Sequence, residues 1–195
     1  MEMLLEWDRN LSLAINQFHF NWLDPVMVFW SQKWVWLPLY ALILAMFYRQ
    51  LDLKRFVTAV FLIAAAITLS DQTASTLLKP FFERLRPCHD PDLQYLLHLP
   101  DGCGGQFGFA SSHAANSFCL ATLVFCFLRV QIKYSWMLFL WAIIIGWSRI
   151  YLGAHFMGDI LAGYIIGFCC ANMSFFLFRK WIKSGPIESA KAEST

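Results

Sequence analysis

The chain is dominated by long apolar stretches that leave little room for charge. Hydrophobic residues make up 58% of its 195 residues and charged residues 14%, against roughly 45–50% and about 25% in ordinary soluble domains. A soluble protein of this size cannot bury so much apolar surface, and a disordered chain would not contain it. The sequence therefore predicts an integral membrane protein.

Stretches that can cross about 30 Å of hydrocarbon define the expected architecture. Five stretches qualify, at residues 34–48 extended by 26–32, 56–78, 114–128, 134–147 and 156–178. Residues 1–23 mix apolar and polar side chains, which predicts an interfacial amphipathic helix. We expect an all-α, polytopic membrane helical bundle with about five transmembrane helices, or six if the first helix inserts.

The expected domain organisation is simple. One membrane-embedded domain covers residues 1–183, with an outer loop at 79–112, and a polar, mobile tail follows at 184–195. Basic residues cluster at 49–55, 129–133 and 179–183. In a five-span arrangement these clusters share one face, which the positive-inside rule makes cytoplasmic. The chain has no basic tract, so we expect no nucleic-acid partner.

The first polar segment on the opposite face is 79–87 (KPFFERLRP), at the end of the second span. Pro80 suits the first turn of a new helix, and Pro87 closes the segment. Lys79 and Arg86 are seven residues apart, so a helical path between them would place both cations on one face. Taken alone, the pair also fits snorkelling residues that anchor a span.

The second segment is 104–113 (GGQFGFASSH), a glycine-rich approach to the third span. Free backbone N–H groups and the positive end of a helix form an anion site there. Ser111 or Ser112 equally suits a plain N-cap, and His113 suits an interfacial position.

The third segment is 148–159 (SRIYLGAHFMGD), at the start of the fifth span. His155 and Asp159 are four residues apart and share a helix face. A carboxylate there fixes the imidazole tautomer and leaves the other ring nitrogen for a substrate. An aspartate this close to hydrocarbon needs a partner, and His155 or Arg149 can supply one. The pair also fits a tether that only joins helix ends.

Together, the three segments point to phosphate chemistry. Three cations and a set of amide donors suit a tetrahedral oxyanion. Two histidines can divide the work of phosphoryl transfer, one attacking phosphorus and one protonating the leaving oxygen.

Lys79-x6-Arg86-Pro87, Ser111-Ser112-His113 and Ser148-Arg149-x5-His155-x3-Asp159 resemble the three-part signature of the type 2 phosphatidic acid phosphatase/haloperoxidase superfamily. The resemblance covers residues from about 56 to 178 in order and spacing. One departure is in the middle motif, where Ala110 and Ser112 replace the usual Pro and Gly. Ser112 must then tolerate the backbone geometry that glycine gave.

The resemblance implies a role for each matching residue. His155 would be the nucleophile that forms a phosphohistidine, Asp159 would hold its ring, and His113 would protonate the leaving group and then activate water. Substrate phosphate would be bound by the cations and the start of the third span, namely Lys79, Arg86, Arg149, Ser111 and Ser112. The resemblance implies no metal and no cofactor.

The resemblance also implies a substrate class and a location. It points to a bacterial plasma (inner) membrane enzyme whose active site faces the periplasm or exterior. The substrate would be a lipid phosphate or diphosphate of the bilayer: an isoprenyl diphosphate such as undecaprenyl diphosphate, phosphatidylglycerophosphate, phosphatidate or a lipid A phosphate.

Three other functions fit the same residues less well. A haloperoxidase would need soluble halide and peroxide, for which a membrane bundle is a poor setting. A silent lipid-binding or transport protein would need the cations but not His113, His155 and Asp159. A metal site on those three residues would be opposed by the basic neighbours.

Five residues outside the signature also carry predictions. Asp71 can pair with a buried donor between helices. His89 and His98 fit surface positions of the outer loop. Cys88 and Cys103 bracket that loop and can form a disulfide if it faces an oxidising compartment.

Overall fold

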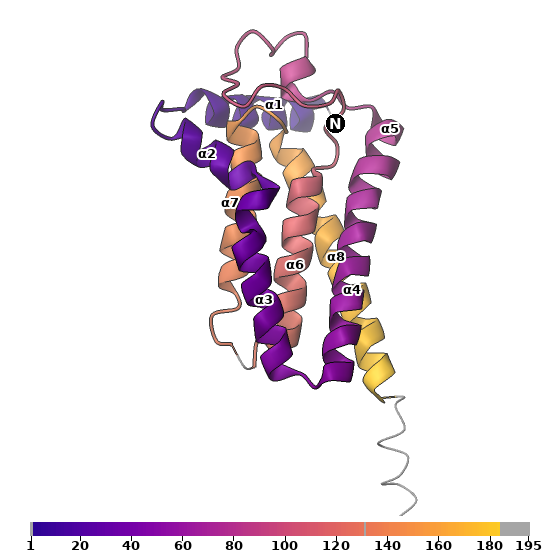
Figure 1. The fold of residues 1–195 in the computed structure, drawn as a ribbon. Coiled ribbons are helices and arrows are strands. Elements are labelled where there is room, and N and C mark those ends of the chain that lie inside the picture. The colour runs from indigo at the N-terminus through magenta and orange to yellow at the C-terminus, as the bar shows by residue number, and fades with distance from the viewer. Residues whose placement is uncertain (1, 131, 184–195) are drawn as a thin grey trace, which may run out of the picture.

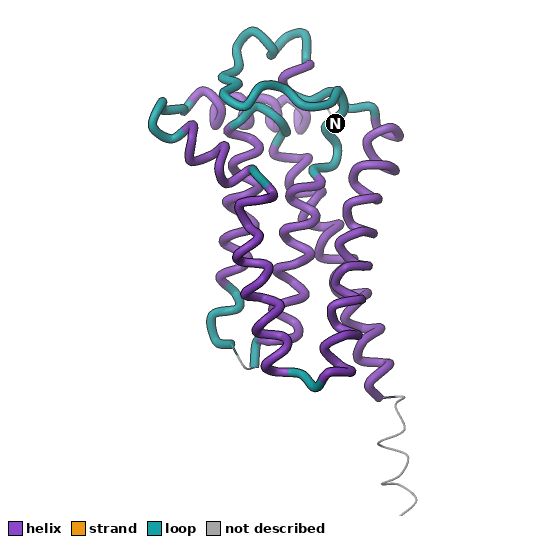
Figure 2. Tube along the Cα trace, in the orientation of Figure 1, coloured by secondary structure: helices purple, strands orange, loops and turns teal. Residues whose placement is uncertain are grey.

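A computed structural model describes residues 2–130 and 132–183, and most of these residues are folded into helices (Figures 1 and 2). The described part contains no β-strand, only an isolated bridge between Leu85 and Phe107. The expected all-α class is thus confirmed, while the predicted tail at 184–195 lies outside the described residues. The main helices are α1 (Glu2–Gln17), α2 (Asp24–Ser31), α3 (Leu37–Gln50), α4 (Leu53–Gln72), α5 (Lys79–Phe82), α6 (Ser112–Leu128), α7 (Met137–Tyr151) and α8 (Met157–Lys183).

The body of the molecule is a bundle in which α3, α4, α6, α7 and α8 run side by side (Figure 1). Helix α6 packs against α4, α7 and α8, which makes it the central helix. By length and apolar composition, two helical stretches can cross a membrane, Leu53–Phe82 and Met157–Ile182, while α6 and α7 are apolar but shorter. The number of spans, predicted as about five, therefore stays a prediction.

Helices α6 and α8 approach each other closely at two glycines of α8. A Cβ atom added at Gly163 would lie 2.6 Å from the Ser111 carbonyl oxygen and 2.9 Å from the Ala114 Cβ. One added at Gly167 would overlap the Ala115 carbonyl oxygen. Small residues four apart are the usual means by which membrane helices bring their backbones together. This contact sets the start of α8 beside the start of α6.

The first predicted span differs from the structure. Residues 26–48 were expected to form one helix, but α2 ends at Ser31 and a 3₁₀ turn (Lys33–Trp36) separates it from α3. The chain is extended at Gln32, and Pro38 lies in the first turn of α3, where a proline is tolerated because it needs no helical partner for a backbone N–H. The Trp36 indole donates to the Trp30 carbonyl at 3.1 Å and holds the bend.

Helix α1 lies across one end of the bundle, roughly perpendicular to the long helices (Figure 1). Its buried residues are polar, Ser12 and Asn16, whereas Leu4, Trp7 and Leu11 are 70%, 70% and 48% exposed. A helix that turns its apolar side outward at the end of a membrane bundle suits the water–lipid interface predicted for residues 1–23.

The two ends of the bundle differ in charge. Figure 1 places the α3–α4 turn, the α6–α7 connection and the C-terminal end of α8 at one end. These are the segments that contain the three basic clusters, at 49–55, 129–133 and 179–183. The long connection 83–111 and α1 lie at the opposite end. The clusters therefore share one face, as the sequence predicted.

Candidate active site

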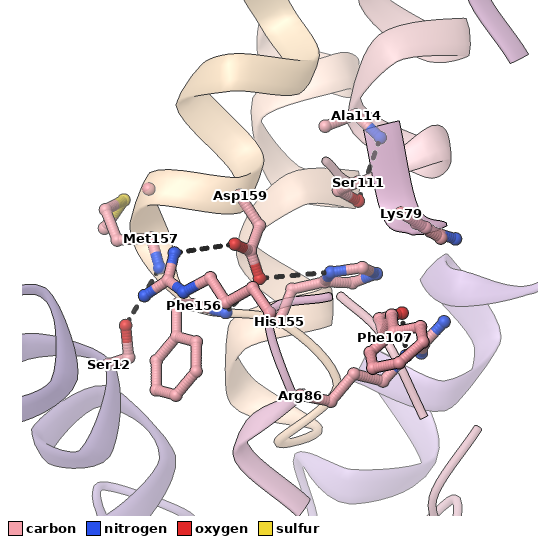
Figure 3. Close-up of polar contacts among 12 residues, drawn as sticks. Ser12, Lys79, Arg86, Phe107, Ser111, Ala114, His155, Phe156, Met157 and Asp159 are labelled. Atoms are coloured by element: carbon pink, nitrogen blue, oxygen red, sulfur yellow. Dashed lines mark hydrogen bonds and ion pairs between the residues drawn. The ribbon is translucent and has the colours of Figure 1, made fainter. Parts of the chain in front are cut away.

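The centre of the site is a buried pair formed by His155, in the turn before α8, and Asp159, in the first turn of α8. The two side chains are 2% and 0% exposed, and His155 Nδ1 lies 3.4 Å from Asp159 Oδ2. That separation is an ion-pair distance but not a good hydrogen bond, and Nδ1 has no other partner among the described residues. The Phe156 N–H donates to Asp159 Oδ2 at 3.0 Å. Figure 3 shows the other ring nitrogen of His155 turned away from Asp159.

Burial decides the protonation state of His155. It lowers the pKa of the imidazole to about 4, although the nearby Asp159 carboxylate raises it; the charges of Arg86 and Arg149 lower it further. The neutral form therefore dominates near pH 7. A neutral imidazole has the free electron pair that a nucleophile needs.

Three cations reach this centre from three different elements. Arg86, in the connection after α5, donates from Nε to the Phe107 carbonyl at 3.2 Å. Arg149, in the last turn of α7, donates to the Ser31 hydroxyl of α2, and its Nε is buried with no partner among the described residues. Figure 3 shows Lys79 and Arg86 on the side of His155 away from Asp159.

Lys79 and Arg86 are not joined by a continuous helix of the kind that would place both cations on one face. The second span runs on through a π-helical turn (Thr73–Leu78) into α5, where Pro80 lies in the first turn as predicted. The helix ends at Phe82, and Glu83 is left-handed with a φ of 46°. The two cations nevertheless line the same opening.

The start of α6 contributes the middle motif. Ser111 is fully buried and caps α6, because its hydroxyl accepts from the Ala114 N–H at 3.5 Å. Its own N–H donates to the Asp159 carbonyl at 3.0 Å, which ties α6 to α8. The next two N–H groups, of Ser112 and His113, belong to the first turn of the helix, where backbone donors lack helical partners.

Ser112 has no need of glycine geometry. Among the described non-glycine residues only Glu83 has a positive φ, and Ser112 begins α6. Its hydroxyl lies 2.7 Å from the Ser75 hydroxyl and accepts from Lys79 Nζ at 3.4 Å. Ser112 therefore adopts ordinary helical geometry at the start of α6, and its hydroxyl contacts Lys79, which is a predicted phosphate ligand.

The sequence interpretation missed two charged residues beside the pair. Arg84 donates to Asp159 Oδ1 at 2.8 Å and to Asp8 Oδ2, on α1, at 2.6 Å. Arg84 stands inside the segment 79–87 that the sequence singled out, two residues before Arg86. Nothing in the sequence pairs Asp8 with a residue 76 positions away.

The predictions outside the signature have mixed outcomes. Asp71 accepts from the Asn116 side chain of α6 at 2.7 Å, so it has a donor between helices as predicted, although that donor is only partly buried. Cys88 and Cys103 form a disulfide. The surface prediction holds for His89, which is exposed. It is wrong for His98, whose side chain is only 24% exposed because its ring pairs with Asp24 at 2.9 Å and stacks on His19.

Two openings are each lined by candidate site residues. A cavity of about 430 Å³ lies among α3, α4, α6 and α7, with a mainly apolar lining that includes Trp36, Phe47 and Trp141. His113 is one of its few polar lining residues. A second, shallower hollow of about 500 Å³ is lined by Lys79 and Arg86 on the outer side.

Apolar helices, a cationic hollow and two histidines, one of which lines an apolar cavity, are the combination expected of a membrane phosphatase that acts on phosphorylated lipids. Comparison with known proteins agrees: the chain belongs to the PAP2 superfamily, which it matches over residues 56–183. It is accordingly a lipid phosphatase.

Two relatives have the same curated description. The chain is 38% identical over 169 residues to a lipid A 4'-phosphatase of Bacteroides thetaiotaomicron, covering 86% of this chain and 75% of the relative. It is 34% identical over 172 residues to a lipid A 4'-phosphatase of Porphyromonas gingivalis, covering 86% and 71%.

A solved structure shares the fold. The transmembrane PAP2-type phosphatidylglycerolphosphate phosphatase of Bacillus subtilis superposes with a TM-score of 0.66 at 24% identity, covering 94% of this chain and 88% of that one.

Proposed function

We propose that the chain hydrolyses a phosphate group from a membrane lipid, without a metal ion, through a phosphohistidine at His155. The buried His155–Asp159 pair beside Lys79, Arg86 and Arg149 is the observation that supports this most strongly. The neutral imidazole attacks phosphorus while the cations hold the phosphate oxygens, and the bond from phosphorus to the lipid oxygen breaks.

The second histidine completes the reaction. His113 gives a proton to the departing lipid oxygen, then accepts one from the water that attacks phosphohistidine, which breaks the phosphorus–nitrogen bond and frees phosphate. Asp159 stabilises the positive charge that His155 acquires in between. Ser111 contributes as the cap that holds the start of α6, and the amides of Ser112 and His113 complete the phosphate cradle.

The apolar cavity supports a substrate that stays in the membrane. It extends from His113, the proposed proton donor, to Phe47 of α3. The leaving group must therefore lie next to an apolar wall, as the chain of a lipid does and a soluble phosphate ester does not.

Among lipid substrates we propose a lipid A phosphate first, because the two relatives described above are lipid A 4'-phosphatases. An isoprenyl diphosphate, phosphatidylglycerophosphate and phosphatidate are the next to test, since each joins a phosphate to apolar chains. A catalytically silent binding protein remains as an outcome of the same experiment.

We propose that the enzyme lies in the bacterial plasma membrane with its site facing the periplasm or exterior. The basic clusters at the opposite end of the bundle support this orientation. So does the Cys88–Cys103 disulfide next to the site, because disulfides persist in oxidising compartments.

The test is phosphate release in detergent, with EDTA, from each of the four lipid classes. We expect release that His155→Ala abolishes, with radiolabelled phosphate trapped on the intact protein after a rapid quench. Binding of the lipids with no release by the intact, folded protein would favour the silent alternative. Release that survives in His155→Ala would place the nucleophile elsewhere.

A further inference from the structure

Helix α1 is attached to the start of α8 by two hydrogen bonds. The Ser12 hydroxyl accepts from the Met157 N–H at 2.9 Å, and Asp8 Oδ1 accepts from the Gly158 N–H at 2.8 Å. Both donors belong to the first turn of α8, which has no helical partner for them. Ser12 and Asp8 thus cap α8 from α1, although they are separated from Met157 and Gly158 by 145 and 150 positions in the sequence. Gly158 leaves the room for this approach, because a Cβ there would lie 2.8 Å from Asp8 Oδ2.

The same Asp8 carboxylate reaches the catalytic pair through Arg84. The guanidinium lies between two carboxylates, 2.6 Å from Asp8 Oδ2 and 2.8 Å from Asp159 Oδ1, and stacks 4.4 Å from the centre of the Phe156 ring. Asp8 and Arg84 are only 15% and 22% exposed, so water screens them weakly. A continuous chain of ion pairs therefore runs from Asp8 on α1 through Arg84 to Asp159, which lies beside His155. Figure 3 shows Asp159 next to the His155 ring.

Asp8 matters because it changes the net charge of the group formed by Asp8, Arg84 and Asp159. Arg84 alone would neutralise Asp159 and leave no net negative charge beside His155. With Asp8 present, two carboxylates face one guanidinium, and one negative charge remains. The imidazole needs that charge, because it becomes positive when it binds phosphorus while Arg86 and Arg149 oppose a positive ring.

We propose that Asp8 is a positioning residue for the nucleophile: through Arg84 it orients Asp159 and preserves the negative charge that stabilises the charged form of His155. This inference rests on the proposed phosphohistidine chemistry. It gives α1 a part in catalysis in addition to its place at the membrane interface.

Asp8→Asn separates the charge from the cap. Asparagine still accepts a hydrogen bond from the Gly158 N–H and is as good a cap as aspartate. We expect kcat to fall about tenfold, with KM nearly unchanged, since one charge changes a neighbour's ionisation by about one pKa unit. The rate of phosphohistidine formation should fall equally, and the acidic limb of the pH profile should move to lower pH. Asp8→Glu should recover most of the activity.

The double variant Asp8→Asn/Arg84→Gln is the decisive measurement. It again leaves Asp159 as the single negative charge beside His155, so we expect it to be more active than Asp8→Asn. If Asp8 only attaches α1 to the bundle, the double variant also loses the Arg84 contact and should be less active than Asp8→Asn. That result would overturn the inference. Arg9→Gln is the matched control on the same helix, because Arg9 bonds Asp90 and Asp92 of the outer connection and does not touch the pair.

His155→Ala distinguishes this inference from the function on which it rests. If His155→Ala is inactive while Asp8→Asn equals the intact protein, the inference is wrong and the phosphohistidine proposal stands. If His155→Ala retains activity, the proposed function itself fails. Melting temperatures of all variants in detergent show that each one is folded, and a fall in kcat shared by Arg9→Gln would also overturn the inference.

Discussion

Gly163→Ala tests whether the close contact of α6 and α8 sets the geometry of the site. The added Cβ would lie 2.6 Å from the Ser111 carbonyl oxygen, roughly 0.8 Å inside the 3.4 Å at which ordinary contact begins. The obstacle is backbone, which cannot rotate away as a flexible side chain can. The two helices must therefore separate at the level of Ser111, which caps α6 and holds α8 through the Asp159 carbonyl.

The expected cost follows from that displacement. Overpacking of a tight contact costs about 1–3 kcal/mol of stability, so the melting temperature in detergent should fall by several degrees. His113 and His155 lie on opposite sides of the contact, and a shift of about 1 Å in a catalytic group costs on the order of a hundredfold in rate. We expect kcat to fall by roughly ten- to a hundredfold.

Phosphate release from a lipid phosphate and thermal unfolding are the two assays. Ile165→Ala is the control, because it truncates a side chain on the same helix that is 64% exposed. Gly163→Ala with the rate and melting temperature of the intact protein would show that the contact does not position the site.

Three further predictions concern single groups. The acidic limb of kcat/KM that belongs to His155 should lie near pH 4, because burial lowers its pKa to about 4; a limb near pH 6.5 in a pH series contradicts this. Since the unfolded chain binds that proton more readily, stability should also fall as the pH drops from 6.5 towards 4. Cys88→Ser should lower the free energy of unfolding by about 3 kcal/mol, because the disulfide to Cys103 closes a separation of 15 residues; an unchanged melting temperature with and without reductant would refute it. Ser112→Gly removes the hydroxyl that accepts from Lys79 and should raise KM by about fivefold, the equivalent of ~1 kcal/mol; an unchanged KM would mean that Lys79 is held by other contacts.

The sequence alone predicts the all-helical bundle and most of its helices. Residues 114–128, 134–147 and 156–178 were expected as spans, and the helices α6, α7 and α8 cover them within a few residues. The reason is that a long apolar run has few alternatives in a membrane, where every backbone group needs a partner inside the helix.

The signature residues were also accessible from the sequence, because each stands at or near a helix end whose position the apolar runs fix. His155 and Asp159 are four residues apart on consecutive turns, a local relation that spacing alone determines. The break between α2 and α3, at the extended Gln32, was missed; Pro38 lies six residues later, in the first turn of α3.

The tertiary structure decided what surrounds those residues. The sequence predicted the class of fold, most of the helices and the candidate phosphate-binding residues, since these depend on local periodicity and spacing. Only the folded chain shows that Asp8 and Arg84 extend the His155–Asp159 pair into an ionic chain, that Cys88 and Cys103 join, and that His98 is half-buried against Asp24. These contacts join segments far apart in the sequence, and they exist only because helix packing brings α1 and the outer connection over the same end of the bundle.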